Sequence, residues 1–344
     1  MNLQNVESNN MNKEKLHLTT QALLTQSKGI LAADETPDNI GRKFSLLHIE
    51  NSPENRRRYR EMLFTTPAIE QYISGVILQD ETIHQSASNG IDFPSLLRGK
   101  GILTGIKVDL GLVPFNNDPV ETRTRGLEGL GDRLQGYKTH LASFAKWRSV
   151  THIDVSADKP TVAAMQANAE ELAEYAAICQ QHEIVPIVEP EVLMDGSHTI
   201  DVSYQVTKDI LHYLFQALKN RGVYMSGILL KPNMIISGLL CPEQAIPEIV
   251  AQKTLECFSD TIPDDVPGVV FLSGGQRDEL AIKHLALMNQ SKDLPYRLSF
   301  SYGRALQRQA MTMWKGQDAY ILKAQAAFFE QARLNSLATS GKLA

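Results

Sequence analysis

The sequence lacks several features that mark membrane proteins, proteins of oxidising compartments and nucleic-acid-binding proteins. Its 344 residues include only three cysteines, an odd number without zinc-ligand spacing, which favours a reducing environment. It has no run of about 18 consecutive apolar residues, so we expect no membrane span. The formal net charge of −5 argues against nucleic acid or an anionic membrane as a partner. We therefore expect a cytoplasmic protein.

The N-terminus lacks the pattern of a targeting segment. Residues 1–15, MNLQNVESNNMNKEK, have no basic-then-apolar order, and they include acidic residues that transit peptides avoid. No Gly/Ser-rich linker divides the rest of the chain. We expect residues 1–15 to be a mobile extension and residues 16–344 to form one domain.

Metal-binding patterns are also missing. The nine histidines form no HExxH or related motif. We expect chemistry without a metal.

Apolar segments of strand length are abundant. Most are continuously apolar, as in strands of a parallel sheet that are covered on both faces. Stretches with helical composition, including 160–181 and 305–336, lie between them. The eight strand-like segments are 29–35, 74–80, 101–109, 144–150, 184–192, 225–232, 268–275 and 297–304. This alternation predicts an α/β fold, a single-domain (β/α)8 TIM barrel, with a doubly wound sheet as the alternative.

Charged residues gather toward the C-terminal ends of the predicted strands, where a barrel has its catalytic mouth. Several have i, i+2 spacing, which places both side chains on one face of a strand. The charges nearly balance, which allows them to tune one another's pKa values. The residues are Asp34, Lys107, Asp109, Lys146, Arg148, Glu189, Glu191, Lys231 and Arg304.

Two features near the C-terminus indicate phosphate binding. Ser273, Gly274 and Gly275 follow the seventh predicted strand, and Gly303 and Arg304 follow the eighth. The loops after these two strands of a barrel commonly hold phosphate through backbone N–H groups, and an arginine adds a forked donor.

Lys231 ends the apolar run Gly-Ile-Leu-Leu. Desolvation and a nearby cation such as Lys146 favour the neutral amine, a nucleophile toward carbonyl compounds. Dehydration of the resulting carbinolamine needs an acid and a base, which Glu189 and Glu191 could supply. The residues thus indicate a lysine-dependent lyase for phosphorylated carbonyl compounds. A pyridoxal-phosphate enzyme fits the same residue types.

The motifs that contain these residues resemble those of class I fructose-bisphosphate aldolases. The resemblance implies reversible cleavage of fructose 1,6-bisphosphate to dihydroxyacetone phosphate and glyceraldehyde 3-phosphate in glycolysis and gluconeogenesis, without metal or cofactor. It also implies a homotetramer. The matching stretches include LAADE, GIKVDLG, FAKWR, PIVEPEV, LLKPNM, FLSGGQ and SFSYGRALQ.

By position in these motifs, Lys231 resembles the Schiff-base lysine and Glu189 the acid/base for carbinolamine dehydration. Asp34 resembles the group that takes the C4-hydroxyl proton. Lys146 and Glu191 resemble the supporting charges around the iminium.

The resemblance also implies two phosphate sites. The residues for the C1 phosphate are Ser273, Gly275, Gly303 and Arg304, and those toward the C6 phosphate are Lys107, Arg148, Thr36 and Asn39.

Two departures from the family pattern bear on detail. The family's usual Ser-Thr-Gly-Ser after LAADE is Thr36-Pro37-Asp38-Asn39 here, and the Asp38 charge is expected to weaken C6-phosphate binding. The chain also lacks a C-terminal tyrosine, its last being Tyr320, so we expect another group, or a slower step, for proton exchange at C3. A preference for another ketose phosphate, or a mainly binding or scaffold role, remains an alternative.

Overall fold

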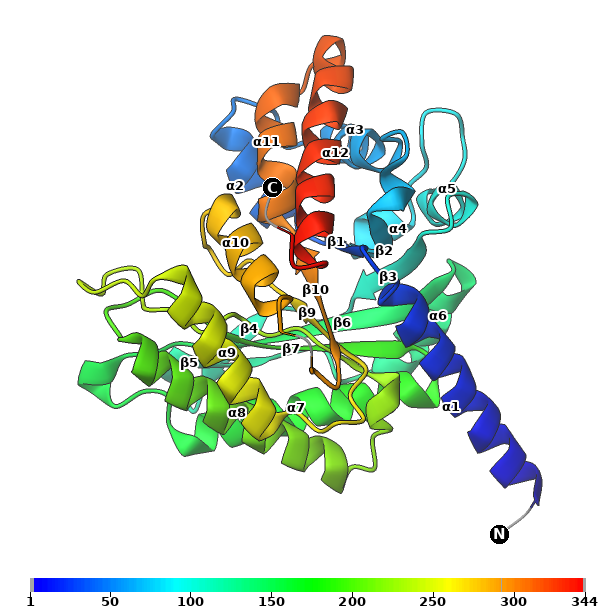
Figure 1. The fold of residues 1–344 in the computed structure, drawn as a ribbon. Coiled ribbons are helices and arrows are strands. Elements are labelled where there is room, and N and C mark those ends of the chain that lie inside the picture. Colours follow the sequence, from blue (N-terminus) through cyan, green and yellow to red (C-terminus); the bar gives the residue numbers. More distant parts are fainter. Residues whose placement is uncertain (1–2, 292, 343–344) are drawn as a thin grey trace.

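Eight parallel strands close into a barrel in the computed structural model, which describes residues 3–291 and 293–342. The strand order around the barrel is β1-β10-β9-β8-β7-β6-β3-β2. Each predicted segment overlaps one strand, so the predicted (β/α)8 barrel is confirmed (Figure 1). The strands are β1 (Gly29–Ala33), β2 (Ile73–Leu78), β3 (Leu103–Lys107), β6 (Ala142–Thr151), β7 (Val185–Val192), β8 (Leu229–Leu230), β9 (Gly268–Phe271) and β10 (Arg297–Tyr302).

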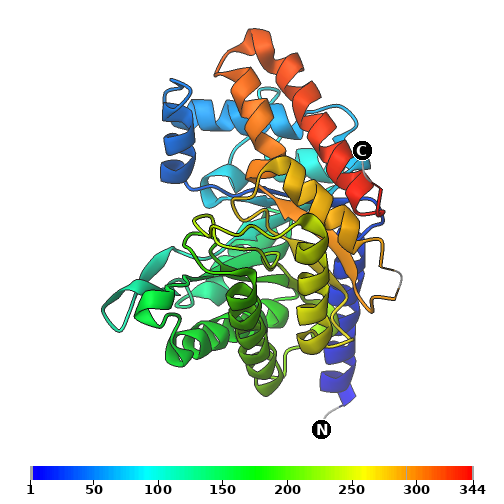
Figure 2. The same cartoon turned by 60° about the vertical axis from the view of Figure 1, so that its left-hand side comes forward.

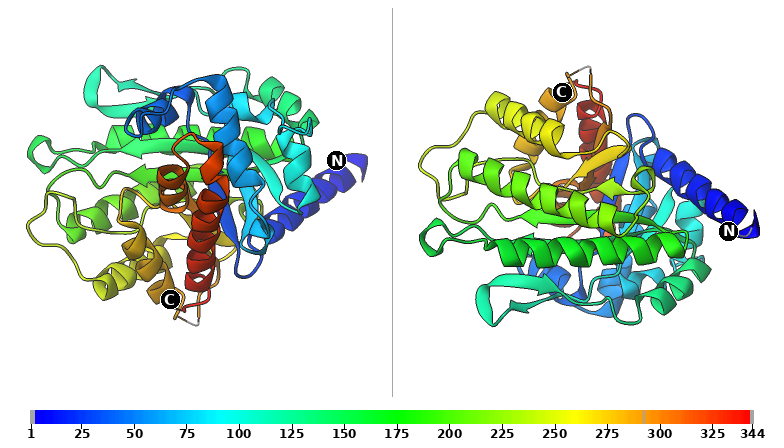
Figure 3. Two further views of the ribbon diagram at one scale, coloured as in Figure 1. Left: turned by 90° about the horizontal axis from the view of Figure 1, so that it is seen from above. Right: turned by 90° about the horizontal axis from the view of Figure 1, so that it is seen from below.

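Helices cover the barrel strands in the views from above and from below (Figure 3). Six of the helices begin with a capping side chain, for example Thr36 before α2 and Ser52 before α3, each followed by proline in the first turn. The helices are α1 (Leu3–Leu23), α2 (Pro37–Ser45), α3 (Pro53–Phe64), α4 (Asp80–Ile83), α5 (Phe93–Gly99), α6 (Leu130–Thr139), α7 (Val162–Gln181), α8 (Ile200–Asn220), α9 (Pro247–Thr261), α10 (Asp278–Met288), α11 (Arg304–Trp314) and α12 (Ile321–Ala338).

The C-terminal end of α1 closes the N-terminal end of the barrel. Leu16, Leu23 and Leu24 belong to the buried apolar cluster inside the barrel. The Phe144 ring belongs to the same cluster. Glycine is required opposite that ring, because a Cβ at Gly105 would clash with it. The interior is therefore a packed core, and the polar mouth lies at the other end.

The N-terminal segment is helical from Leu3. Asn12 Nδ2 donates to the Gln180 carbonyl over 2.8 Å, and Lys15 pairs with Glu183 at 2.6 Å. Residues 1–2 lie outside the described residues, and the expected mobility of residues 1–15 stays a prediction.

Two parts of the chain differ from the sequence-based expectation. The stretch 305–336 forms two helices, because Lys315 and Gly316 both adopt positive φ and end α11. The hairpin of β4 (Leu112–Phe115) and β5 (Asp118–Thr124) was not predicted, and it turns at Asn116-Asn117. Figure 2 shows this hairpin projecting from the body, and Figure 1 places it at the end of the barrel opposite α1.

Candidate active site

The predicted catalytic residues meet at the C-terminal end of the barrel. Asp34 and Lys231 directly follow β1 and β8, whereas Lys146 lies within β6 and Glu189 within β7. Parallel pairing of β6 with β7 sets Arg148 opposite Glu189, and Lys231 N donates to the Val188 carbonyl over 2.8 Å. This register brings residues far apart in the sequence into one cluster.

Glu189 lies between two lysines. Its Oε1 is 3.1 Å from Lys231 Nζ, and its Oε2 is 3.3 Å from Lys146 Nζ. The three side chains are only 4–5% exposed. A carboxylate so buried and so close to an amine can exchange protons with groups bound at that amine.

Lys146 also contacts two further carboxylates. Asp34 Oδ2 lies 2.8 Å and Asp109 Oδ2 3.8 Å from its Nζ. Asp109 in turn pairs with Lys107 at 2.5 Å. The result is a continuous network of buried charges across the mouth of the barrel.

The network fixes the charge state of two members. Burial would raise the pKa of Asp34, but the charges of Lys146, Lys231 and Lys107 outweigh it and hold that pKa well below its ordinary value. Burial would lower the pKa of Lys146, but Asp34, Glu189 and Asp109 raise it well above the usual range. Asp34 is thus a carboxylate and Lys146 an ammonium at neutral pH.

Two acceptors of the cluster can take a further hydrogen bond. Glu189 Oε2 and Asp109 Oδ2 are buried and lie 3.3 and 3.8 Å from Lys146 Nζ, but neither accepts a hydrogen bond from a described side chain or backbone group. Each can therefore accept from a hydroxyl of a bound ligand. The site therefore suits a polyhydroxylated substrate.

Glu191 forms its ion pair with Arg148 and not with a lysine of the cluster. Its carboxylate accepts a hydrogen bond from Arg148 Nε. Burial would lower the pKa of Arg148, but the negative charge of Glu191 outweighs it and raises that pKa. The structure places Glu191 beside the cluster as the partner of a guanidinium, a supporting rather than a central position.

The loop after β9 contains two consecutive glycines in the left-handed region. Gly274 and Gly275 have φ of 52° and 81°, which favour glycine. A Cβ at Gly275 would lie 2.7 Å from Met194 Sδ. Arg304, the first residue of α11, donates to the Gln276 carbonyl and so joins the turn to the loop after β10. Burial lowers the pKa of Arg304.

The four residues predicted toward the second phosphate line one cavity of about 790 Å³. Lys107 and Asp109 belong both to this cavity and to the charged network, so the two are continuous. Sequence reasoning missed two further cations on its wall, Arg42 and Arg133. Asp38 is exposed and does not line this cavity. The cavity residues predicted from sequence are Thr36, Asn39, Lys107 and Arg148.

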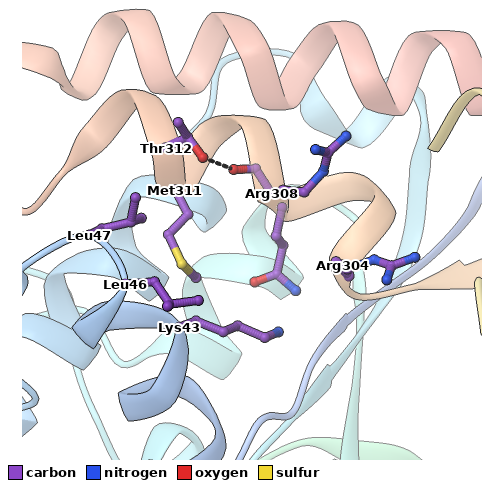
Figure 4. A pocket seen from close by; sticks show the side chains of 8 residues that line it. Lys43, Leu46, Leu47, Arg304, Arg308, Met311 and Thr312 are labelled. Carbon is purple, nitrogen blue, oxygen red and sulfur yellow. Dashed lines mark hydrogen bonds between the residues drawn. The ribbon is translucent and has the colours of Figure 1, made fainter. Parts of the chain in front are cut away.

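A smaller cavity of about 240 Å³ lies between α2 and α11 (Figure 4). Leu46, Leu47 and Met311 supply apolar surface, Lys43 reaches into it, and Arg304 lies at the end away from Leu47. Arg304 therefore borders both this cavity and the glycine turn after β9.

The family follows from comparison of the whole chain with known proteins. Residues 15–344 match the family model described as "Fructose-bisphosphate aldolase class-I". The chain belongs to the class I fructose-bisphosphate aldolase family. The predicted family is thereby confirmed, and the activity of an aldolase, a lyase, is assigned to the chain.

Individual aldolases match over nearly the full length. A protein of Xanthomonas axonopodis pv. citri named probable fructose-bisphosphate aldolase class 1 is 48% identical, with 96% of this chain and 99% of that protein covered. The fructose-bisphosphate aldolase of Dictyostelium discoideum is 44% identical, with 96% and 92% covered. Plasmodium falciparum aldolase, solved in complex with TRAP and a small-molecule inhibitor, has a TM-score of 0.95 at 43% identity and covers 97% of this chain and 96% of its own.

Two further findings concern metal ions and membranes. Among residues 3–291 and 293–342, no group of three or more His, Cys, Asp or Glu side chains is arranged to hold a metal ion. No helix in the same part of the chain is long and apolar enough to cross a membrane.

Proposed function

We propose that this aldolase cleaves fructose 1,6-bisphosphate reversibly through a Schiff base on Lys231. The observation that carries the proposal is the buried contact of Glu189 with Lys231, 3.1 Å apart, at the end of an apolar strand. An acid/base beside an amine is the pairing that carbinolamine chemistry needs.

Schiff-base formation uses Lys231 and Glu189. The neutral amine of Lys231 attacks the C2 carbonyl, forming a C–N bond, and proton transfer gives a neutral carbinolamine. Protonated Glu189 then donates a proton to the C2 hydroxyl, which leaves as water while the C=N bond forms. The product is an iminium that accepts electrons from the neighbouring C3–C4 bond.

Cleavage of that bond uses Asp34. Its carboxylate removes the C4-hydroxyl proton, the C4–O bond becomes a carbonyl, and the C3–C4 electron pair moves into the iminium to give an enamine. The low pKa of Asp34 ensures that the group is ionised before this step. The ammonium of Lys146, 2.8 Å from Asp34, holds it in place. Glyceraldehyde 3-phosphate leaves first.

After the aldehyde leaves, Asp34 releases its proton to water, and Glu189, a carboxylate since the dehydration step, takes up a proton from water. We assign the protonation of the enamine at C3 to this protonated Glu189, because its side chain lies beside the Schiff-base nitrogen. The Glu189 carboxylate then deprotonates the water that attacks the iminium, and the C–N bond breaks as the C2 carbonyl re-forms. Glu191 acts indirectly, by holding Arg148 at the cavity wall. Dihydroxyacetone phosphate then leaves and Lys231 is restored as an amine.

The phosphates are assigned to the two cationic regions. The C1 phosphate binds the backbone and hydroxyl groups of Ser273, Gly275 and Gly303 together with Arg304. The C6 phosphate binds in the 790 Å³ cavity, where Arg42 joins the four residues predicted from sequence. This second cationic region supports a bisphosphate as substrate over fructose 1-phosphate.

We further propose a cytoplasmic homotetramer. A relative from Arabidopsis thaliana, 46% identical, is named as a cytosolic aldolase, and the tetramer is what the family resemblance implies. Sedimentation equilibrium tests the second part: a mass near that of four chains supports it, and a monomer contradicts it.

Aldol cleavage assayed with and without EDTA tests the proposed function. We expect cleavage of fructose 1,6-bisphosphate that EDTA leaves intact, and its loss in Lys231→Met. The Lys283→Ala variant, at a half-buried lysine that pairs with Glu248 on α9, is the control and should keep full activity. Activity that EDTA abolishes, or that survives Lys231→Met, contradicts the proposal.

A further inference from the structure

Gln276 contacts both halves of the C1-phosphate site. Its backbone N–H and its side-chain Nε2 donate to the Ser273 carbonyl over 3.0 and 3.3 Å, which closes the glycine turn. Its own carbonyl accepts from Arg304. Gln276 is 5% exposed, so nothing in bulk water substitutes for these contacts.

The Gln276 side chain is itself fixed by His284 of α10. His284 is 3% exposed, and its Nδ1 lies 2.7 Å from Gln276 Oε1. Burial and the nearby Lys283 lower the pKa of His284 to about 4, so the ring is neutral at pH 7. Because Gln276 donates through Nε2 to Ser273, its Oε1 faces the ring, and Nδ1 must carry the hydrogen.

We propose that Gln276 and His284 are positioning residues for the C1 phosphate, with His284 orienting the amide that holds the Ser273–Gln276 turn and Arg304 together. The inference deepens the function proposed above and rests on it. Neither residue is assigned a contact with the reacting carbons. Their loss should therefore weaken phosphate binding and leave the chemistry at Lys231 largely intact.

The effect should appear in KM more than in kcat. Without His284, the buried Gln276 Oε1 loses its hydrogen-bond donor, and the amide no longer holds the turn in place. The loss of one such hydrogen bond is enough to weaken phosphate binding by about tenfold. We expect His284→Leu to raise the KM for fructose 1,6-bisphosphate and the inhibition constant of inorganic phosphate by about tenfold, with kcat within about threefold.

A matched series separates positioning from mere packing. In His284→Asn the side-chain amide can donate from nearly the place of Nδ1, so KM and the phosphate inhibition constant should return to within about twofold of the wild type. Gln276→Met removes the amide at similar volume and should reproduce the leucine variant. Lys283→Ala, on the same helix with a side chain 42% exposed, should change neither constant.

The wild-type protein provides a test that needs no variant. Nitrogen-15 NMR of the imidazole should show a neutral ring protonated at Nδ1, and the Nε2–H tautomer contradicts the inference. A folded His284→Leu variant whose KM and phosphate inhibition constant match the wild type also contradicts the inference. A variant that loses kcat with its phosphate inhibition constant unchanged contradicts it as well. Wild-type protein without any aldol cleavage overturns the proposed function instead, whereas normal cleavage with unaffected variants overturns only this inference.

Discussion

Glu189 Oε1 lies 3.1 Å from Lys231 Nζ, with both side chains about 5% exposed or less. The same carboxylate faces Lys146 through its other oxygen at 3.3 Å. We propose that this one carboxylate has two tasks: it stabilises the Lys146 ammonium, and it exchanges protons beside the Lys231 amine.

Glu189→Gln removes the acid/base and keeps the side-chain volume. We expect kcat for fructose 1,6-bisphosphate to fall by about 10²–10⁴-fold, the usual contribution of general acid–base catalysis. Steady-state kinetics measures it, with circular dichroism as a check on folding. A folded variant within about threefold of wild-type kcat contradicts the role of Glu189.

Asp34→Asn tests the electrostatics through pH. Because the folded-state pKa of Asp34 lies below its ordinary 3.8, its charge stabilises the protein above pH 3.8, and this stabilisation is lost as the pH falls through the folded-state value. Wild type should therefore be more stable than Asp34→Asn by a constant amount from pH 5 to 8, and the difference should narrow below about 3.8. Urea unfolding at several pH values measures it, and a gap that widens in acid contradicts the depressed pKa.

Arg42→Ala tests the C6-phosphate end. We expect KM for fructose 1,6-bisphosphate to rise by about tenfold, because a cation on the cavity wall is removed, and KM for fructose 1-phosphate to change by less than about twofold. The exposed Asp38→Asn is the neighbouring control, and it should alter neither KM appreciably because Asp38 does not line the cavity. A marked fall in the KM for fructose 1,6-bisphosphate in Asp38→Asn would instead support the sequence-based expectation that the Asp38 charge weakens C6-phosphate binding.

Gly105→Ala tests the packing around the Phe144 ring inside the barrel. The added methyl group clashes with the Phe144 ring, so unfolding free energy should fall by about 1–3 kcal/mol. Gly99→Ala is the control, because a Cβ there meets nothing within 4 Å and alanine favours the helix. Chemical denaturation compares them, and equal stability of the two variants contradicts the packing described.

The strands and the mouth residues were predictable because buried parallel strands are continuously apolar and their ends are polar. Asp34, Glu189 and Lys231 could be found in this way. The β4–β5 hairpin could not, since its strands are partly exposed and lack a continuously apolar run. The Asn116-Asn117 turn was the one available hint.

The contacts inside the site depend on tertiary structure, and sequence alone did not give them. The Glu189–Lys231 distance depends on the register between neighbouring strands. Arg42 reaches the cavity from the face of α2 that also carries Asn39, a placement that requires the helix orientation. No motif in the sequence distinguishes His284 from the other histidines, and only its hydrogen bond with Gln276 in the fold does so.

Borohydride reduction in the presence of dihydroxyacetone phosphate tests the central claim most directly. The enzyme is inactivated, digested and analysed by mass spectrometry to locate the modified residue. We predict one secondary-amine adduct on Lys231, none in Lys231→Met, and none on Lys146, which its three carboxylate neighbours hold as an ammonium. No adduct in an active enzyme, or an adduct on Lys146 in place of Lys231, contradicts the Schiff-base mechanism proposed for this site.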